Sequence, residues 1–327
     1  MTQLSAAGVS RLDFGIPIPE RIHPEAEQIG EHLLTWASRV GLVTDARERA
    51  RLDAAGFHLL AARILPDAHP SDVEVYARWV LWLFHLDDEQ DEGSMGLRAE
   101  LVHTTYAAIT SIVEGRSDPS TASAPVTALA DLWPRTAREM SPQWRRRFLE
   151  HIHHHRDAFL TQIAHRHNGT LATPAEYPSL RRDDNAMFMV DLLEVVHQTE
   201  IPPDLVATSS WTELCAASSD LVAWCNDVVS LPREAARGET TNYVLVLRHA
   251  TGCDEHTALD QVYAHITRRL HDLREAERVL LADARHLAPT VDPDRLRLVV
   301  RTIRDIPGAH LAWMFSSGRH QEQPPTE

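Results

Sequence analysis

An abrupt change from apolar to acidic side chains occurs in residues 79–91, which are Trp79-Val80-Leu81-Trp82-Leu83-Phe84-His85-Leu86-Asp87-Asp88-Glu89-Gln90-Asp91. The first eight residues are too rich in large apolar side chains for a solvated loop, so they predict a buried helix. At about 100° per residue, Asp87 and Asp91 lie one turn apart on one face of that helix, with Asp88 to the side. Carboxylates this close repel one another, so the face is unfavourable unless cations or solvent compensate.

A second polar motif begins about 140 residues later and reads Asn226-Asp227-Val228-Val229-Ser230-Leu231-Pro232-Arg233-Glu234. Asn226, Ser230 and Glu234 recur every four residues, so they form one stripe along a helix. The apolar residues 221–225 precede the stripe, which indicates that it projects from a buried helix. Pro232 removes one backbone hydrogen bond, and this predicts a bend near Ser230.

The two motifs supply the ligands that hard divalent cations prefer. Carboxylate, amide and hydroxyl oxygens, with no cysteine nearby, indicate Mg²⁺ or Mn²⁺ rather than zinc. Mg²⁺ usually keeps several waters and takes further ligands from substrate phosphates. Either motif alone also fits an ordinary polar helix end, but their joint occurrence predicts a site for several divalent cations.

The chain resembles the bacterial class I terpene synthases, or terpenoid cyclases. Asp87, Asp88 and Asp91 match the family's aspartate-rich motif, and Asn226, Asp227, Ser230 and Glu234 match its second metal motif. The resemblance implies an all-α fold, a single helical barrel with a central apolar cavity and both motifs at its mouth. It also implies three Mg²⁺ ions, with Mn²⁺ as a substitute, that hold the diphosphate of an isoprenoid. The matching segment runs from Phe14 to Arg319, so residues 1–320 are expected to form the cyclase domain and residues 321–327 a disordered tail.

Basic and polar residues at family spacings extend the resemblance to the diphosphate. Arg181 stands about 45 residues before Asn226 and matches the diphosphate sensor, with Asp184 and Asn185 at the linker and effector positions. The spacing to Asp184 favours Arg181 over the adjacent Arg182, and asparagine at the effector position departs from the usual glycine. The list of implied diphosphate ligands is Arg181, Arg233, Arg319 and His320. The last two match a closing Arg-Tyr pair in which histidine replaces tyrosine.

The resemblance implies a magnesium-dependent cyclase that ionises farnesyl diphosphate, cyclises the carbocation and releases diphosphate, as a carbon–oxygen lyase acting on phosphates. Geranylgeranyl diphosphate is the alternative substrate. Remoter alternatives are a chain-elongating prenyl transferase and a non-catalytic isoprenoid-binding protein, but Asn226, Ser230 and Glu234 favour the cyclase. Phe84, one turn before Asp88, is the candidate aromatic wall residue, with Trp313 second.

Composition agrees with a large helical protein. The chain has 327 residues with only 13 glycines, and residues 261–286 carry apolar side chains at helical spacing. We expect helix breaks in the proline-containing residues 16–24, 66–70, 115–125 and 202–203.

Charge and cysteine usage restrict the partners. A net charge of −15 argues against nucleic acid, and three cysteines in no metal spacing suit the cytoplasm. No leader or bilayer-spanning run is visible, so we expect no stable membrane insertion, and a homodimer is left open.

The twenty histidines allow a rival hypothesis. His151 and His155 are four residues apart and could share a transition metal on one helix face. A polar helix face that happens to be rich in histidine explains the same pattern, and we prefer it.

Overall fold

The computed structural model describes residues 13–91, 93–116, 123–237 and 241–319, apart from the side chains of Asp91 and Arg237. These residues form helices and contain no strand. The helices are α2 (Ala26–Arg39), α3 (Ala46–Ala55), α4 (Phe57–Ile64), α5 (Pro70–Asp91), η1 (Met95–Leu97), α6 (Ala99–Val113), α7 (Ala124–Thr136), α8 (Pro142–Asn168), α9 (Tyr177–Asp184), α10 (Phe188–Val196), α11 (Pro203–Val206), α12 (Ser209–Arg237), α13 (Tyr243–Thr251), α14 (Glu255–Leu287) and α15 (Pro293–Ser316). The predicted all-α class is confirmed.

The helices end where the sequence supplies breakers and caps. The four predicted proline-containing breaks fall before α2, between α4 and α5, between α6 and α7, and at the start of α11. Asp45 and Asp254 cap α3 and α14 by accepting hydrogen bonds from the backbone N–H of Glu48 and of Thr257, each at 2.8 Å. Gly56 ends α3 with a φ of +64°, a conformation that glycine adopts without a steric cost. Pro232 lies inside α12, which continues to Arg237.

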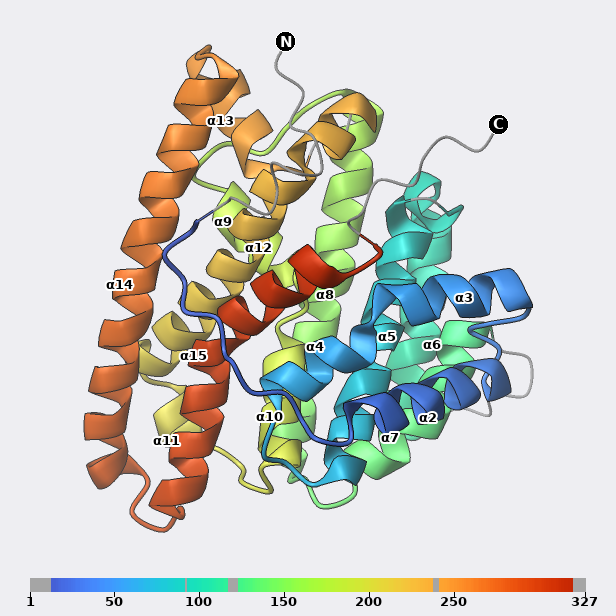
Figure 1. Ribbon diagram of the computed structural model, residues 1–327, viewed down its shortest axis with the longest axis vertical. Helices are drawn as coiled ribbons and strands as arrows, with labels where there is room; N and C mark the ends of the chain where they lie inside the picture. The colour runs from blue at the N-terminus through green and yellow to red at the C-terminus, as the bar shows by residue number, and fades with distance from the viewer. Residues whose placement is uncertain (1–12, 92, 117–122, 238–240, 320–327) are drawn as a thin grey trace.

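The helices close into a ring (Figure 1). Each helix of the ring contacts the next one, in the order α5, α10, α15, α12, α9, α8, α6 and α7. The last of these, α7, contacts α5 again and closes the ring. α14 packs outside this ring, along α12 and α13. A closed ring of helices is the predicted barrel, and it brings the ends of α5 and α12 into one assembly although they are far apart in the sequence.

An aromatic core fixes the direction of α5. Trp79 and Trp82 have no exposed surface, and their ring centroids are 5.2 Å apart. Trp79 packs against Phe148 of α8 at 5.5 Å, and both indoles pack against Phe188 of α10 at 6.0–6.1 Å. Each indole N–H has a partner, since Trp79 donates to Thr136 Oγ1 at 2.9 Å and Trp82 to a backbone carbonyl at 2.8 Å. Such aromatic pairs contribute about 0.5–1.5 kcal/mol each beyond burial. The predicted buried helix is therefore confirmed, and its packing determines where the acidic end of α5 emerges.

The segment before α2 crosses the outside of the barrel over α15 (Figure 1). Phe14 stacks on Tyr263 of α14 with ring centroids 5.3 Å apart. A side-chain carbon added at Gly308 of α15 would lie 2.0 Å from the carbonyl oxygen of Pro17, so only glycine permits this approach. The segment thus ties α14 and α15 together from outside.

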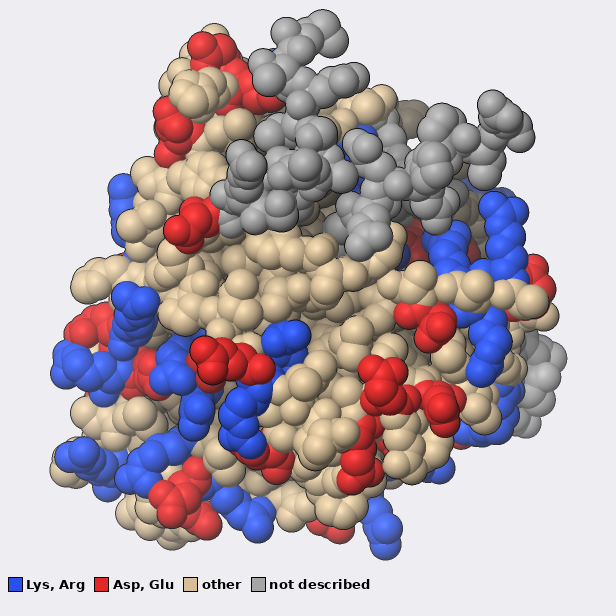
Figure 2. Space-filling view, viewed as in Figure 1, with Lys and Arg blue, Asp and Glu red and all other residues tan. Residues whose placement is uncertain are grey.

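Charged groups on the face that carries this segment are of both signs. In Figure 2, basic and acidic side chains are interspersed over the lower half, and no continuous basic surface is visible on that face. None of the described helices is long and apolar enough to cross a bilayer. Residues 321–327, the expected tail, lie outside the described residues.

Candidate active site

Asp87 and Asp88 emerge at the end of α5 and are held by Arg319. The Arg319 Nη2 atom lies 3.1 Å from Asp87 Oδ2 and 2.6 Å from Asp88 Oδ1. Arg51 of α3 approaches Asp88 at 3.6 Å. The side chain of Asp91 lies outside the described part of the chain, although its backbone completes α5 as predicted. Two of the three predicted acidic ligands thus share one basic partner.

The end of α15 is anchored before it reaches Arg319. The Trp313 indole N–H and the Ser317 hydroxyl both donate to the carbonyl of Ala55, at 2.7 and 2.8 Å. The backbone N–H of Gly318 donates to the carbonyl of Ala54 at 2.9 Å. These bonds attach α15 to the end of α3 and hold Arg319 beside the acidic motif.

The second motif lies on α12 as the predicted polar stripe. The Ser230 hydroxyl donates to the carbonyl of Asn226 at 2.7 Å, and Asn226 Oδ1 accepts from Arg181 at 3.3 Å. Glu234 accepts from the amide of Asn242 at 2.8 Å. Burial raises the pKa of Glu234, and the nearby Asp227 carboxylate raises it further, while the bonds from Asn242 and Ser230 oppose the shift.

Asp227 is fully buried behind this stripe and organises it. Its carboxylate accepts from the Tyr177 hydroxyl at 2.6 Å, from Arg181 Nε at 3.3 Å and from the backbone N–H of Tyr243 at 3.2 Å. Burial raises its pKa, and Arg181, Tyr177 and Tyr243 counteract that shift. Asp227 therefore joins α9, α12 and α13 and orients Arg181 toward Asn226.

Arg181 and Arg182 point to different partners. Arg181 donates to Asp184, Asn226 and Asp227, so it lies against the second motif. Arg182 instead donates to Asp220 at 2.8 and 3.2 Å, and that carboxylate also accepts from Arg269 of α14. The geometry favours Arg181 as the residue that faces the motifs.

Helix α9 breaks where the resemblance places the effector. Asn185 ends α9 with an ordinary φ of −74°, and its amide donates to the Ser219 hydroxyl at 3.1 Å. The left-handed residue is the next one, Ala186, with a φ of +58°. The chain therefore leaves the helix at the proposed effector position, and the residue after it has the unusual backbone angle. A left-handed alanine costs roughly 1–2 kcal/mol and is retained because the surrounding structure imposes it.

The end of α15 and the residues just after it contact both motifs. Met314 Sδ lies 3.5 Å from the amide nitrogen of Asn226, and Arg319 binds Asp87 and Asp88. Partial burial raises the pKa of Asp87 to about 6, against the attraction of Arg319, and Asp184 and Asp88 raise it further. Asp184 is the partner of Arg181, so the α5 rim and the α9–α12 rim lie within electrostatic range.

Comparisons with known proteins agree with this geometry. The profile described as terpene synthase family 2, C-terminal metal binding, matches residues 78–272, which contain both motifs. The chain is 32% identical over 247 residues to (+)-T-muurolol synthase from Roseiflexus castenholzii, covering 75% of each chain. It is 30% identical to (−)-delta-cadinene synthase from Streptomyces clavuligerus, covering 91% of each. The crystal structure of a-eudesmol synthase has the same fold, with a TM-score of 0.82, 22% identity and coverage of 94% of this chain and 99% of that one.

The chain belongs to the terpene synthase family. It is a bacterial class I terpene synthase and thus a lyase acting on prenyl diphosphates.

The donor set of this terpene synthase fits divalent cations of the magnesium type. Asp87, Asp88, Asn226, Ser230 and Glu234 offer hard oxygen atoms. Among the described residues, no three His, Cys, Asp or Glu side chains converge closely enough to form a metal site by themselves. Proteins usually hold Mg²⁺ with carboxylate oxygens together with waters and substrate phosphate oxygens.

The structure does not bring every predicted residue to the rim. Arg233 is exposed on α12 and forms no hydrogen bond or ion pair with the described residues. His320 lies outside the described residues. Phe84 instead joins a cluster beneath the acidic motif, where its ring centroid lies 4.7 Å from Phe57 and 5.2 Å from Trp313. The guanidinium carbon of Arg319 lies 5.0 Å from the Phe84 ring centroid, so this ring already faces a cation.

Three residues of the site escaped the sequence analysis. Tyr177 and Asn242 bind Asp227 and Glu234, and only the capping preference of asparagine at the start of α13 marks Asn242 in the sequence. His310 of α15 has a buried Nδ1 that finds no hydrogen-bond partner in the described part of the chain, and its ring centroid lies 5.3 Å from that of Trp313. Burial lowers the pKa of His310 to about 4, and Arg181 lowers it further, so the ring is neutral at pH 7. No motif spacing marks His310.

The rival histidine hypothesis is not supported. His151 Nδ1 lies 2.6 Å from Asp191, whereas His155 Nδ1 lies 2.6 Å from the Tyr106 hydroxyl. Each ring has its own partner on a different helix, so the pair does not form a shared site.

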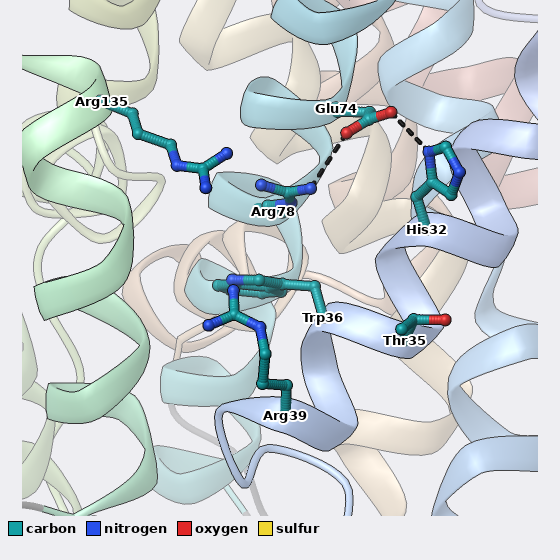
Figure 3. Close-up of a pocket in the computed structure, with 7 residues that line it drawn as sticks. All are labelled: His32, Thr35, Trp36, Arg39, Glu74, Arg78 and Arg135. Atoms are coloured by element: carbon teal, nitrogen blue, oxygen red, sulfur yellow. Dashed lines mark hydrogen bonds and ion pairs between the residues drawn. The ribbon is translucent and has the colours of Figure 1, made fainter.

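Two hollows lie away from the rim. One of about 300 Å³ is lined by residues of α2, α5 and α7 (Figure 3), and another of about 360 Å³ lies between α6, α7 and Arg145. Neither contains a residue of the two metal motifs. The central apolar cavity beneath the motifs therefore stays a prediction.

Proposed function

We propose that this terpene synthase ionises farnesyl diphosphate with the help of three Mg²⁺ ions and cyclises the resulting carbocation. One observation supports the proposal: Met314 at the end of α15 contacts Asn226, and Arg319 just after α15 contacts Asp87. The substrate follows from the relative named as a farnesyl diphosphate cyclizing (+)-T-muurolol synthase.

The metal ligands are Asp87, Asp88 and Asp91 on α5 and Asn226, Ser230 and Glu234 on α12. When bound, the ions neutralise the charge that develops on the departing diphosphate. Arg181 and Arg319 hold carboxylates in this structure, and their planar guanidinium groups donate paired hydrogen bonds to phosphate oxygens equally well. We infer that both exchange carboxylate partners for the diphosphate. Arg233 and His320 are secondary diphosphate ligands in this proposal.

Carbon–oxygen cleavage leaves an allylic cation next to apolar side chains. Phe57, Phe84 and Trp313 form an aromatic wall close to Asp87 and Asp88. Aromatic faces stabilise cations by up to about 2 kcal/mol when water is excluded. The wall therefore guides the cation while excluding water. Asp184 and Asn185 link Arg181 to the break before α10. We propose that this break transmits the effect of diphosphate binding from Arg181 to α10.

Residues 1–320 act as one catalytic domain in this proposal. We also propose that the protein is located in the reducing cytoplasm, because its three cysteines are free.

Incubation of the purified protein with ten-, fifteen- and twenty-carbon prenyl diphosphates and Mg²⁺, followed by gas chromatography with mass spectrometry, tests the proposal. A cyclic fifteen-carbon product is expected. Cyclic products from the twenty-carbon substrate alone would assign geranylgeranyl diphosphate instead. A longer linear diphosphate formed with added isopentenyl diphosphate would indicate a prenyl transferase.

A further inference from the structure

The hollow in Figure 3 lies on the flank of the barrel, between α2, α5 and α7. Its volume is about 300 Å³, and its lining residues are His32, Thr35, Trp36, Arg39, Glu74, Arg78 and Arg135. Arg78 precedes Asp88 by ten residues in α5, so at 1.5 Å per residue it lies roughly 15 Å from the metal rim along the helix. The hollow is therefore separate from the site that the two motifs form.

Arg78 is the buried charged residue of this lining. It is 8% exposed, its Nη2 donates to Glu74 Oε2 at 3.0 Å, and its guanidinium carbon lies 5.7 Å from the Trp36 ring centroid. Its Nε is buried and has no hydrogen-bond partner among the described residues. A buried guanidinium N–H without an acceptor is unfavourable, so this atom indicates that an acceptor belongs nearby.

Two further guanidinium groups face the same hollow. Arg135 extends from α7 toward Arg78 (Figure 3), and it forms no hydrogen bond or ion pair with any residue that the structure describes. Arg39 donates to both oxygens of Asp131, at 2.9 and 3.0 Å. Three arginines are thus balanced by two carboxylates, Glu74 and Asp131.

These three arginines and two carboxylates give the hollow a net positive charge, although the chain as a whole carries a charge of −15. Burial lowers the pKa of Arg78, Glu74 opposes this, and Arg135 and Arg39 lower the pKa further by repulsion. Glu74 also lies 2.6 Å from His32 Nδ1, so its carboxylate is engaged by two partners at the edge of the hollow. An anion placed among the three arginines would relieve their mutual repulsion.

The chemistry of the lining selects the class of anion. Guanidinium groups pair best with phosphate and carboxylate oxygens, and the hollow is at the small end of ligand pockets. Trp36 is 2% exposed beneath Arg78 and offers no free ring face on which a nucleobase could stack. We propose that Arg39, Arg78 and Arg135 form a second anion site, separate from the metal rim, that binds a small phosphate-class oxyanion.

Isothermal titration with inorganic phosphate, at low salt and with EDTA present, tests this site. EDTA prevents metal-dependent binding at the rim, so the test does not depend on the proposed function. We expect one binding site, weakened about tenfold by Arg135→Gln, because a charge-assisted hydrogen bond of this kind is worth about one factor of ten. Arg138→Gln, which removes the same charge from an exposed residue outside the lining, is expected to retain wild-type affinity.

Arg135 is exposed, so its replacement is not expected to disturb folding, and circular dichroism checks this. No binding by wild-type protein, or equal weakening by Arg135→Gln and Arg138→Gln, would overturn the site. Binding that is lost in Arg319→Gln but kept in Arg135→Gln would place the anion at the rim and also overturn it.

The phosphate group that binds here could belong to a free anion or to a lipid headgroup. Inorganic diphosphate is titrated in parallel, and sedimentation with phosphatidylcholine vesicles that contain phosphatidic acid tests a lipid phosphate. Arginine-dependent binding of free phosphate or diphosphate supports the proposal of a small free anion. Arginine-dependent binding to vesicles alone would contradict that part and assign the hollow to a lipid headgroup.

Discussion

Adjacent arginines at positions 181 and 182 differ only in the direction of their side chains, and this difference gives a sharp test. Arg181 donates to Asp227, Asp184 and Asn226 from three different nitrogen atoms, and the single ammonium group of lysine cannot reach all three acceptors in that geometry. We expect Arg181→Lys to lower kcat by about tenfold or more, since one charge-assisted bond has about that worth. Arg182→Lys keeps its charge beside Asp220 and is the matched control. Steady-state kinetics with farnesyl diphosphate compare the two, and equal losses would contradict the assignment.

Glu234 is the only carboxylate among the three predicted ligands on α12. Glu234→Gln preserves the shape of the side chain but removes its negative charge, so turnover should fall by at least about 100-fold. Even the mutation of a residue that only supports a metal ligand commonly lowers metal affinity or activity by about 10–100-fold. The pKa of Glu234 is raised by burial, so loss of the charge should not unfold the protein. Activity assays paired with circular dichroism check both expectations. Glu277→Gln on α14 is the control, and near-normal turnover in Glu234→Gln would remove this residue from the metal site.

At the scale of elements, the contact between α6 and α8 predicts a pH effect. His155 is buried against Tyr106, and burial lowers its pKa from 6.5 to about 4. The unfolded chain takes up a proton below pH 6.5 while the folded protein resists until about pH 4, so stability from this residue is lost as pH falls through that window.

We therefore expect His155→Gln, which keeps a hydrogen-bond acceptor for Tyr106 but does not titrate, to lose less stability on acidification. Urea unfolding at pH 7 and pH 5 should show the stability gap between wild type and variant shrinking by about 2 kcal/mol. A gap that does not change with pH would show that His155 does not titrate differently in the two states.

The contact between α15 and the segment before α2 predicts an effect whose sign is diagnostic. Alanine in a helix interior is normally favoured over glycine by about 1 kcal/mol. At Gly308 the added carbon would lie 2.0 Å from the Pro17 carbonyl oxygen, so Gly308→Ala should instead destabilise the protein by about 1–3 kcal/mol. Thermal unfolding measures the change. A stabilised variant would mean that the segment does not pack on α15 in solution.

At the scale of the whole molecule, the two motifs should act as one site. Mg²⁺ and inorganic diphosphate together should raise the melting temperature by several degrees beyond either alone, because ligands at 100 times Kd stabilise by about 2.7 kcal/mol. Asn226→Ala should abolish this magnesium-dependent increment, although Asn226 is on the opposite rim from Asp87. Differential scanning fluorimetry checks it, and a retained increment in the variant would argue against a shared site.

Local sequence was sufficient to predict several of the helices and the polar groups that they carry. The apolar run at residues 79–86, the proline-containing breaks and the four-residue spacing of Asn226, Ser230 and Glu234 each depend on neighbours within a few turns, so the sequence predicted α5, the helix boundaries and the polar stripe of α12. It also favoured Arg181 over Arg182 by spacing. Partners from distant helices were beyond its reach, and the left-handed Ala186, the buried His310 and the exposed position of Arg233 were not predicted.

Amino-acid order alone determined the chemical groups that each helix carries, because periodicity and capping act over a few residues. Only the tertiary structure decided which groups meet: Arg319 with Asp87 and Asp88, Met314 with Asn226, and Arg39, Arg78 and Arg135 around one hollow. The reason is that these contacts between distant side chains depend on how the helices pack into a closed ring. That packing follows from the fit of the buried side chains of all the helices together, which no local pattern contains.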